Sequence, residues 1–64
     1  MQGKVKWYNG NKGFGFAQGD DGNDYFIHHS QVQSGDNLIE NTSIEFTDVE
    51  TDKGLQAKKV VVLQ

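Results

Sequence analysis

The sequence predicts an all-β fold, a small closed barrel of five antiparallel strands. The 64 residues include eight glycines, and no stretch repeats apolar residues at the i, i+3, i+4 and i+7 positions of an amphipathic helix. The apolar segments are short, aromatic and β-branched, and Gly, Asn and Asp bound them, as is typical of strands. A flat sheet of five strands would leave one face bare, because no helix is available to cover it. Closing into a barrel buries the strand edges best.

Composition limits the possible classes of protein. We expect residues 1–64 to form one domain, because a chain of 64 residues has no room for a second core. Cysteine is absent, which excludes disulfides and thiolate metal sites. No apolar run reaches the length of a membrane span or a signal-peptide core. We therefore expect a cytoplasmic monomer with no metal, no cofactor and no membrane partner.

The first three predicted strands follow one another through short connections. Lys4–Tyr8 and Gly13–Gln18 flank the loop Asn9–Lys12. Asp20–Asn23 (DDGN) predicts a tight turn, because Asp, Gly and Asn supply the positive-φ positions of hairpin turns. The third strand, Asp24–His29, follows that turn directly.

An irregular segment follows the third strand. We expect Ser30 to cap one helical turn, Gln31–Gln33, by accepting a backbone N–H. Residues 34–42 have no regular pattern. Asn41 is expected to be left-handed, because its short amide side chain tolerates that conformation.

The last two predicted strands are Ser43–Glu50 and Leu55–Leu63. Val49 is out of step with the apolar alternation before it, which predicts a β-bulge near Asp48. The continuous apolar run Val60–Leu63 fits either a strand buried on both sides or a break in the alternation.

Alternation along the second and third strands gathers aromatic rings on one face of the sheet. That face holds Phe14, Phe16, Phe26 and His28. Three phenylalanines usually indicate a core, but a buried imidazole without a partner is costly. The other face offers small residues with Tyr25 and Ile27, which suits a tight barrel interior. We therefore expect the aromatic face to lie in solvent, as a binding surface.

The charge is distributed unevenly along the chain. A net charge of −3 alone argues against a nucleic-acid binder. However, residues 1–19 carry three lysines and no acid, residues 20–52 carry all nine acids, and residues 53–64 carry three lysines. Six of the seven aromatic residues lie within the first 26 positions, close to lysines. The predicted aromatic face is therefore locally cationic.

Three segments resemble bacterial cold-shock proteins. Lys6–Phe16 (KWYNGNKGFGF) resembles the opening of these proteins, and Asp24–Ser30 (DYFIHHS) is similar to their second nucleic-acid-binding motif. Lys53–Ala57 (KGLQA) is similar to the entry to their last strand. The resemblance covers nearly the whole chain. It implies an OB-fold barrel that binds single-stranded DNA and RNA, and an ATP-independent RNA chaperone that regulates transcription and translation.

The resemblance also implies a set of contact residues. They are Lys6, Trp7, Lys12, Phe14, Phe16, Phe26 and His28, with Tyr8, Asn9, His29, Lys53 and Gln56 at neighbouring positions. Tyr8 and His29 stand where phenylalanine is usual in the family. The 34–42 loop is about two residues shorter than the family pattern, where loops tolerate changes of length, and it lacks the usual aromatic residue. Lys58 and Lys59 stand where small or neutral residues are common.

Other interpretations fit the motifs less well. Lys12–Phe16 matches the start of the RRM signature, but Ala17 and Gly19 break it, and the two helices of an RRM are not visible. His28 and His29 are expected to face opposite ways on a strand, which disfavours a shared metal ion. No acid is placed to orient a nucleophile and base, so we expect no enzyme. The remaining alternative is an OB-like barrel whose aromatic face binds a peptide or an oligosaccharide.

Overall fold

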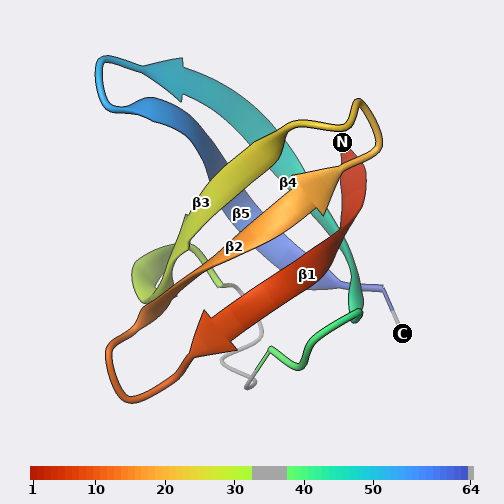
Figure 1. The fold of residues 1–64 in the computed structure, drawn as a ribbon, viewed down its shortest axis with the longest axis vertical. Coiled ribbons are helices and arrows are strands. Elements are labelled where there is room, and N and C mark those ends of the chain that lie inside the picture. The colour runs from red at the N-terminus through yellow and green to blue at the C-terminus, as the bar shows by residue number, and fades with distance from the viewer. Residues whose placement is uncertain (33–37, 64) are drawn as a thin grey trace.

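The computed structural model describes residues 1–32 and 38–63. Its elements are β1 (Gln2–Asn9), β2 (Phe14–Gly19), β3 (Asp24–His28), the 3₁₀ turn η1 (His29–Gln31), β4 (Ser43–Thr51) and β5 (Gly54–Val62). The strands close into a barrel in the order β1-β2-β3-β5-β4 (Figure 1). The predicted fold class and all five predicted strands are confirmed, and each strand end lies within two residues of the prediction.

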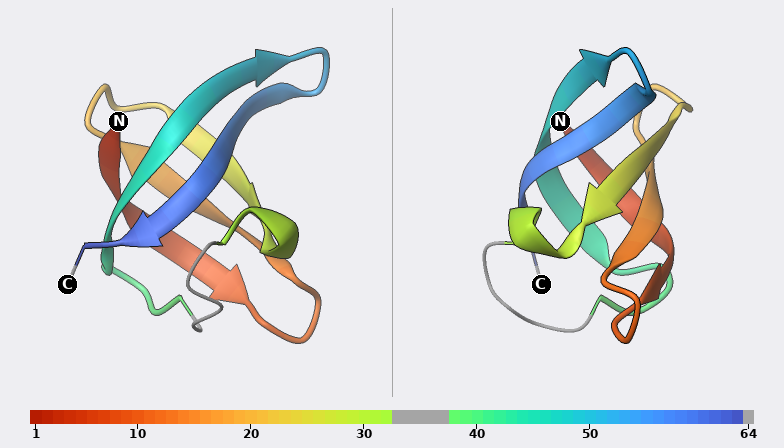
Figure 2. Two further views of the ribbon diagram at one scale, coloured as in Figure 1. Left: turned by 180° about the vertical axis from the view of Figure 1, so that it is seen from behind. Right: turned by 90° about the vertical axis from the view of Figure 1, so that its left-hand side faces the viewer.

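One strand pairing departs from the all-antiparallel expectation. β3 and β5 run parallel, with Phe26 level with Gln56 and Ile27 level with Ala57, and Figure 2 shows the two strands side by side. The other four pairings are antiparallel. Five strands around a closed ring cannot alternate in direction throughout, because an odd ring must bring two strands of the same direction together.

The core lies inside the barrel and draws on all five strands. Its buried members, none more than 5% exposed, are Val5, Ala17, Tyr25, Ile27, Leu38, Ile44, Phe46, Ala57 and Val60. Gly15 faces this interior, where a Cβ would lie 2.8 Å from Cδ1 of Tyr8. The small residues of β2 therefore leave the space that larger neighbours fill. Each large apolar side chain buried here contributes about 1.5–3 kcal/mol.

A bulge in β1 decides which way Trp7 points. Val5 pairs with Ala17 and Trp7 pairs with Phe16, so Lys6 is an extra residue on β1. Val5 is 1% exposed and Trp7 is 44% exposed, although strict alternation would put both on one face. The inserted residue therefore turns the indole out of the barrel.

The predicted bulge near Asp48 is wrong, because the extra residue lies in the partner strand. Glu45 pairs with Val61 and Thr47 pairs with Lys58, so β5 has one more residue than β4 between these two pairs. Lys59 has φ 53°, the left-handed conformation that a bulge residue can adopt. Val49 is out of step because it lies on the outward side of a regular strand, level with Gln56 of β5.

The predicted turn conformations are confirmed where the structure describes them. Gly22 has φ 88° in the turn between β2 and β3, and Asn41 has φ 71°. Residues 38–42 contain no strand or helix, as expected. The prediction for residues 34–37 lies outside the described residues.

The helical turn begins two residues earlier than predicted, and His28 caps it in place of Ser30. His28 is the last extended residue, with φ −104° and ψ 145°, and its Nδ1 accepts the N–H of Ser30 at 3.3 Å. The imidazole therefore makes the bond that the serine hydroxyl was expected to make. Gln33 lies outside the described residues. No helix in residues 1–32 or 38–63 is long and apolar enough to cross a membrane.

Candidate nucleic-acid interface

Four aromatic rings form a continuous cluster on the outer face of β1, β2 and β3. We call Trp7, Phe14, Phe16 and Phe26 the aromatic platform. Ring centroids are 5.8 Å apart for Trp7–Phe14, 5.7 Å for Trp7–Phe16, 6.0 Å for Phe14–Phe26 and 5.6 Å for Phe16–Phe26. Aromatic pairs prefer separations of about 4.5–7 Å and gain about 0.5–1.5 kcal/mol each. Each ring touches two others, so the cluster is held in place before any ligand arrives.

The strand register explains why these rings meet. Trp7 lies opposite Phe16, which lies opposite Phe26 on the next strand, while Phe14 lies opposite His28. The three phenylalanines are half-buried and His28 is exposed. The predicted facing of the second and third strands is therefore confirmed.

Lys6 is held by a carboxylate at the edge of the platform. Its Nζ lies 3.3 Å from Oδ2 of Asp24, and the two side chains are 47% and 51% exposed. Sequence reasoning missed Asp24 as a residue of this face. Its position could have indicated this: Asp24 lies opposite Gln18, two residues along the strand from the Phe16–Phe26 pair and so on the same face.

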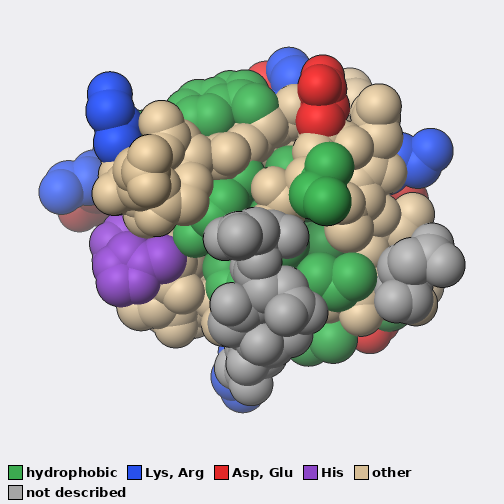
Figure 3. Space-filling view, turned by 90° about the horizontal axis from the view of Figure 1, so that it is seen from below, with side chains coloured by type: hydrophobic (Ala, Val, Ile, Leu, Met, Phe, Trp, Pro, Cys, Tyr) green, Lys and Arg blue, Asp and Glu red, His purple; other side chains and the backbone are tan. Residues whose placement is uncertain are grey.

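The two histidines lie together at the other end of the platform. Their ring centroids are 4.4 Å apart, and Figure 3 shows both side chains as one patch at the edge of the molecule. The expectation that His28 and His29 face opposite ways is wrong, because strand alternation ends where His29 enters η1. His29 packs over Gly13, where a Cβ would lie 2.6 Å from Cδ2 of the imidazole. No group of three metal-ligating side chains occurs among the residues described.

Asn9 organises the loop that presents Lys12. Its Oδ1 accepts the backbone N–H groups of Asn11 at 3.0 Å and Lys12 at 3.1 Å. Its backbone carbonyl accepts the N–H of Gly13 at 2.8 Å. The side-chain oxygen of Asn9 is thus used by the loop, and Lys12, two residues before Phe14, is left exposed.

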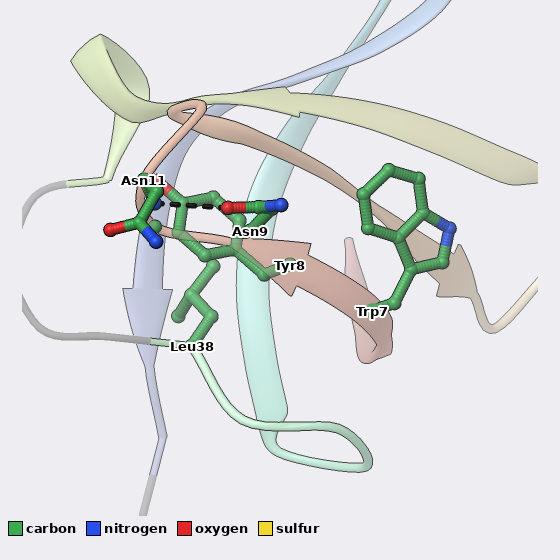
Figure 4. A pocket seen from close by; sticks show the side chains of 6 residues that line it. Trp7, Tyr8, Asn9, Asn11 and Leu38 are labelled. Carbon is green, nitrogen blue, oxygen red and sulfur yellow. Dashed lines mark hydrogen bonds between the residues drawn. The ribbon is translucent and has the colours of Figure 1, made fainter.

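Tyr8 points away from the platform. It lies opposite Gly15 on the inward side of β1 and packs against the core. Figure 4 shows the Tyr8 ring beside Leu38, with Trp7 directed away from both. These side chains, with Asn9, Gly10 and Asn11, line a hollow of about 590 Å³. Of the residues named by the resemblance, Tyr8 is the one that the barrel turns inward.

Residues of the β4–β5 hairpin meet the platform at its far side. Gln56 is level with Phe26. A second hollow, of about 530 Å³, is lined by Phe16, Asp24, Phe26, Lys53, Gly54, Leu55 and Gln56. The structure thus brings Lys53 and Gln56 to the same surface as the platform, although they are far from it in sequence.

The fold and this surface define the class of the protein, a small OB-type barrel with an exposed aromatic face. The chain belongs to the family described as "'Cold-shock' DNA-binding domain", whose model matches residues 1–63. Nucleic-acid binding of the cold-shock type is therefore its class of function, and the class is not one of enzymes.

Individual relatives agree with this assignment. The chain is 46% identical to Cold shock-like protein CspC of Bacillus cereus, covering 98% of this chain and 100% of that protein. It is 50% identical to Cold shock protein CspA of Staphylococcus saprophyticus, covering 97% of each. The solved structure of drosophila Unr CSD456 superposes with a TM-score of 0.74 at 25% identity, over 98% of this chain and 26% of that one.

Proposed function

We propose that this chain binds unpaired DNA or RNA by stacking bases on the aromatic platform. The observation that carries the proposal is the set of four rings in mutual contact on the solvent side of the barrel. Every base has a π face, so successive bases can stack on such a surface whatever their identity. Each stack is worth about 1–3 kcal/mol by alanine substitution.

Lysines position the backbone of the bound strand in this proposal. Lys6, Lys12 and Lys53 lie around the platform, and all three are exposed. Three phosphate contacts give a slope of about −2 for log affinity against log salt, at about 0.7 per contact for single strands. Stacking supplies most of the affinity, which is why a chain of net charge −3 can bind a polyanion.

A duplex hides the faces of its bases between stacked neighbours. Binding to unpaired strands alone shifts hairpins toward their open form by mass action. This passive effect is the basis for proposing an ATP-independent RNA chaperone in the cytoplasm that regulates transcription and translation. His28 and His29 flank the platform and extend it as further stacking surfaces.

Fluorescence of Trp7, the single tryptophan of the chain, tests the proposal. Titration with heptathymidylate is expected to quench the fluorescence strongly, because a base stacks on the indole. A blunt duplex of the same composition is expected to leave it unchanged. Equal quenching by both ligands, or quenching by an oligosaccharide or peptide and not by the single strand, would reject stacking of unpaired bases.

A further inference from the structure

We propose that Lys58 extends the interface across β5 and binds a phosphate of the single strand beyond His28. This inference rests on the proposed function, since it adds a contact to the same site. Lys58 is not among the contact residues that the sequence implied. Its place in the barrel is the observation that points to it.

The parallel register of β3 and β5 puts Lys58 at the end of the platform. Ile27 is level with Ala57, and both are buried. One residue further on, His28 ends β3 and Lys58 follows in β5. Level residues of parallel strands face the same side, so the imidazole and the lysine both point outward.

The bulge at Lys59 keeps Lys58 on the outside. Ala57 and Val60 are 1% and 0% exposed although they are three positions apart. Strict alternation back from Val60 would direct Lys58 into the barrel, where its ammonium would be costly to bury. The left-handed Lys59 absorbs the extra residue. Thr47, which pairs with Lys58 on β4, is exposed, as an outward position requires.

Lys58 itself is half-buried. Within the described part of the chain, the ion pair joins Lys6 to Asp24, and no carboxylate lies within salt-bridge distance of Lys58. Phe14 lies opposite His28, and the Ile27–Ala57 register continued by one residue puts Lys58 next, so a row across three strands begins with a stacking ring and ends with a cation.

A lysine at this point suits a phosphodiester. A strand whose bases stack on the platform carries one negative charge per nucleotide, and the lysine ammonium binds phosphate as a point charge. One such contact adds about 0.7 to the salt slope of a single strand. If the contact contributes nothing at about 1 M salt, this slope corresponds to a gain in affinity of about eightfold at 0.05 M salt and about twofold at 0.4 M.

The test compares Lys58→Gln with Lys4→Gln in the full chain. Both variants lose one positive charge and keep most of the side-chain length, and Lys4 is exposed on β1 opposite Gln18 and Ser43. Binding of oligothymidylates of increasing length, from three nucleotides upward, is measured by Trp7 fluorescence between 0.05 and 0.4 M NaCl. We expect the slope of log affinity against log salt to be about 0.7 shallower in Lys58→Gln than in the unmodified chain. This difference should occur only with ligands long enough to pass His28. Lys4→Gln is expected to keep the wild-type slope.

The outcomes separate this inference from the proposed function. Failure of the unmodified chain to bind any single strand would reject the proposed function. Normal binding with an unchanged salt slope in Lys58→Gln would reject the role of Lys58 and leave the proposed function standing. The same would follow if Lys4→Gln lost as much slope, or if Lys58→Gln lost it with the trinucleotide as well. Lys58→Arg keeps the charge and is expected to keep the slope. A thermal melt of each variant shows that the barrel is intact, and a reduced slope in Lys58→Arg would also overturn the inference.

Discussion

The two faces of the β2–β3 hairpin place apolar side chains in opposite environments. Ile27 and Phe26 are neighbours in the chain, yet the first is 0% exposed and the second is only half-buried on the platform. Ile27 contacts the interior formed by all five strands, whereas Phe26 contacts mainly Phe14 and Phe16. The inward face therefore stabilises the barrel, and the outward face is free to hold a ligand.

This difference shows that aromatic content alone does not locate the core of a small barrel. A 64-residue chain buries only about 60% of the surface that it exposes when unfolded, so many apolar groups must remain outside. Where they gather in one patch, as in the aromatic platform, they form a surface suited to a ligand. Substitutions on the two faces should separate stability from binding.

Ile27→Ala is expected to have the largest effect and to act on stability. Truncating a fully buried isoleucine removes its transfer free energy and leaves a cavity, at a cost of about 2–5 kcal/mol. A domain of this size has a stability of only a few kcal/mol, about 0.05–0.15 kcal/mol per residue, so much of the population should unfold. Urea denaturation followed by Trp7 fluorescence measures the loss.

Phe26→Ala is the matched substitution one residue away, and we expect it to act on binding. Loss of one stacking ring should weaken affinity for heptathymidylate by about 1–3 kcal/mol, which is roughly tenfold. The free energy of unfolding should change much less than in Ile27→Ala, because the ring is partly in water already. An unfolded Phe26→Ala with a stable Ile27→Ala would reverse the assignment of the two faces.

The hydrogen bond between Asp21 and the buried Tyr25 makes the stability of the barrel depend on pH. The Tyr25 hydroxyl donates to Oδ2 of Asp21 at 2.6 Å, and this bond, with the N–H groups of Asn23, holds the pKa of Asp21 below its usual 3.8. The folded pKa lies below the unfolded one, so this stabilisation is complete above the unfolded pKa and is lost as pH falls through the folded pKa. We expect wild-type stability to decline below about pH 4.

The control for this prediction is Asp21→Asn, which retains a hydrogen-bond acceptor but does not titrate in that range. Its free energy of unfolding, measured in urea from pH 2.5 to 7, is expected to be lower than wild type at neutral pH and to vary less with acid. Parallel curves for the two proteins would show that other carboxylates cause the acid sensitivity.

The sequence predicted the two faces of β2 and β3 because both strands keep strict alternation from end to end. Alternation did not predict the outward turn of Trp7, which only the resemblance implied, because an inserted residue at Lys6 reverses the alternation and nothing local distinguishes that residue from its neighbours. The bulge was predicted in the wrong strand, because an outward Val49 breaks the apolar alternation of β4 just as an inserted residue would. The extra residue is in β5 instead. Alternation thus predicts faces within unbroken strands only.

Contacts between strands set a second limit. The pair of Lys6 with Asp24 joins residues 18 positions apart, so no local pattern could indicate it. The parallel neighbours Ile27 and Ala57 are separated by a still longer segment, part of which has no regular pattern. Barrel closure determines both, which is why Lys53 and Gln56 could be assigned to the interface only by resemblance.

Asp24→Asn is expected to have the smallest effect, and it tests whether the carboxylate competes with the ligand. Asp24 holds the Lys6 ammonium at 3.3 Å, and an exposed pair of this kind is worth about 0–1 kcal/mol. Neutralising the carboxylate frees the lysine for phosphate, so affinity for heptathymidylate should rise by up to about fivefold at low salt. The gain should disappear in the double variant Lys6→Gln/Asp24→Asn, because no cation is then released. Weaker binding by Asp24→Asn alone would mean instead that the carboxylate contacts the ligand directly, most simply by accepting an N–H from a base edge.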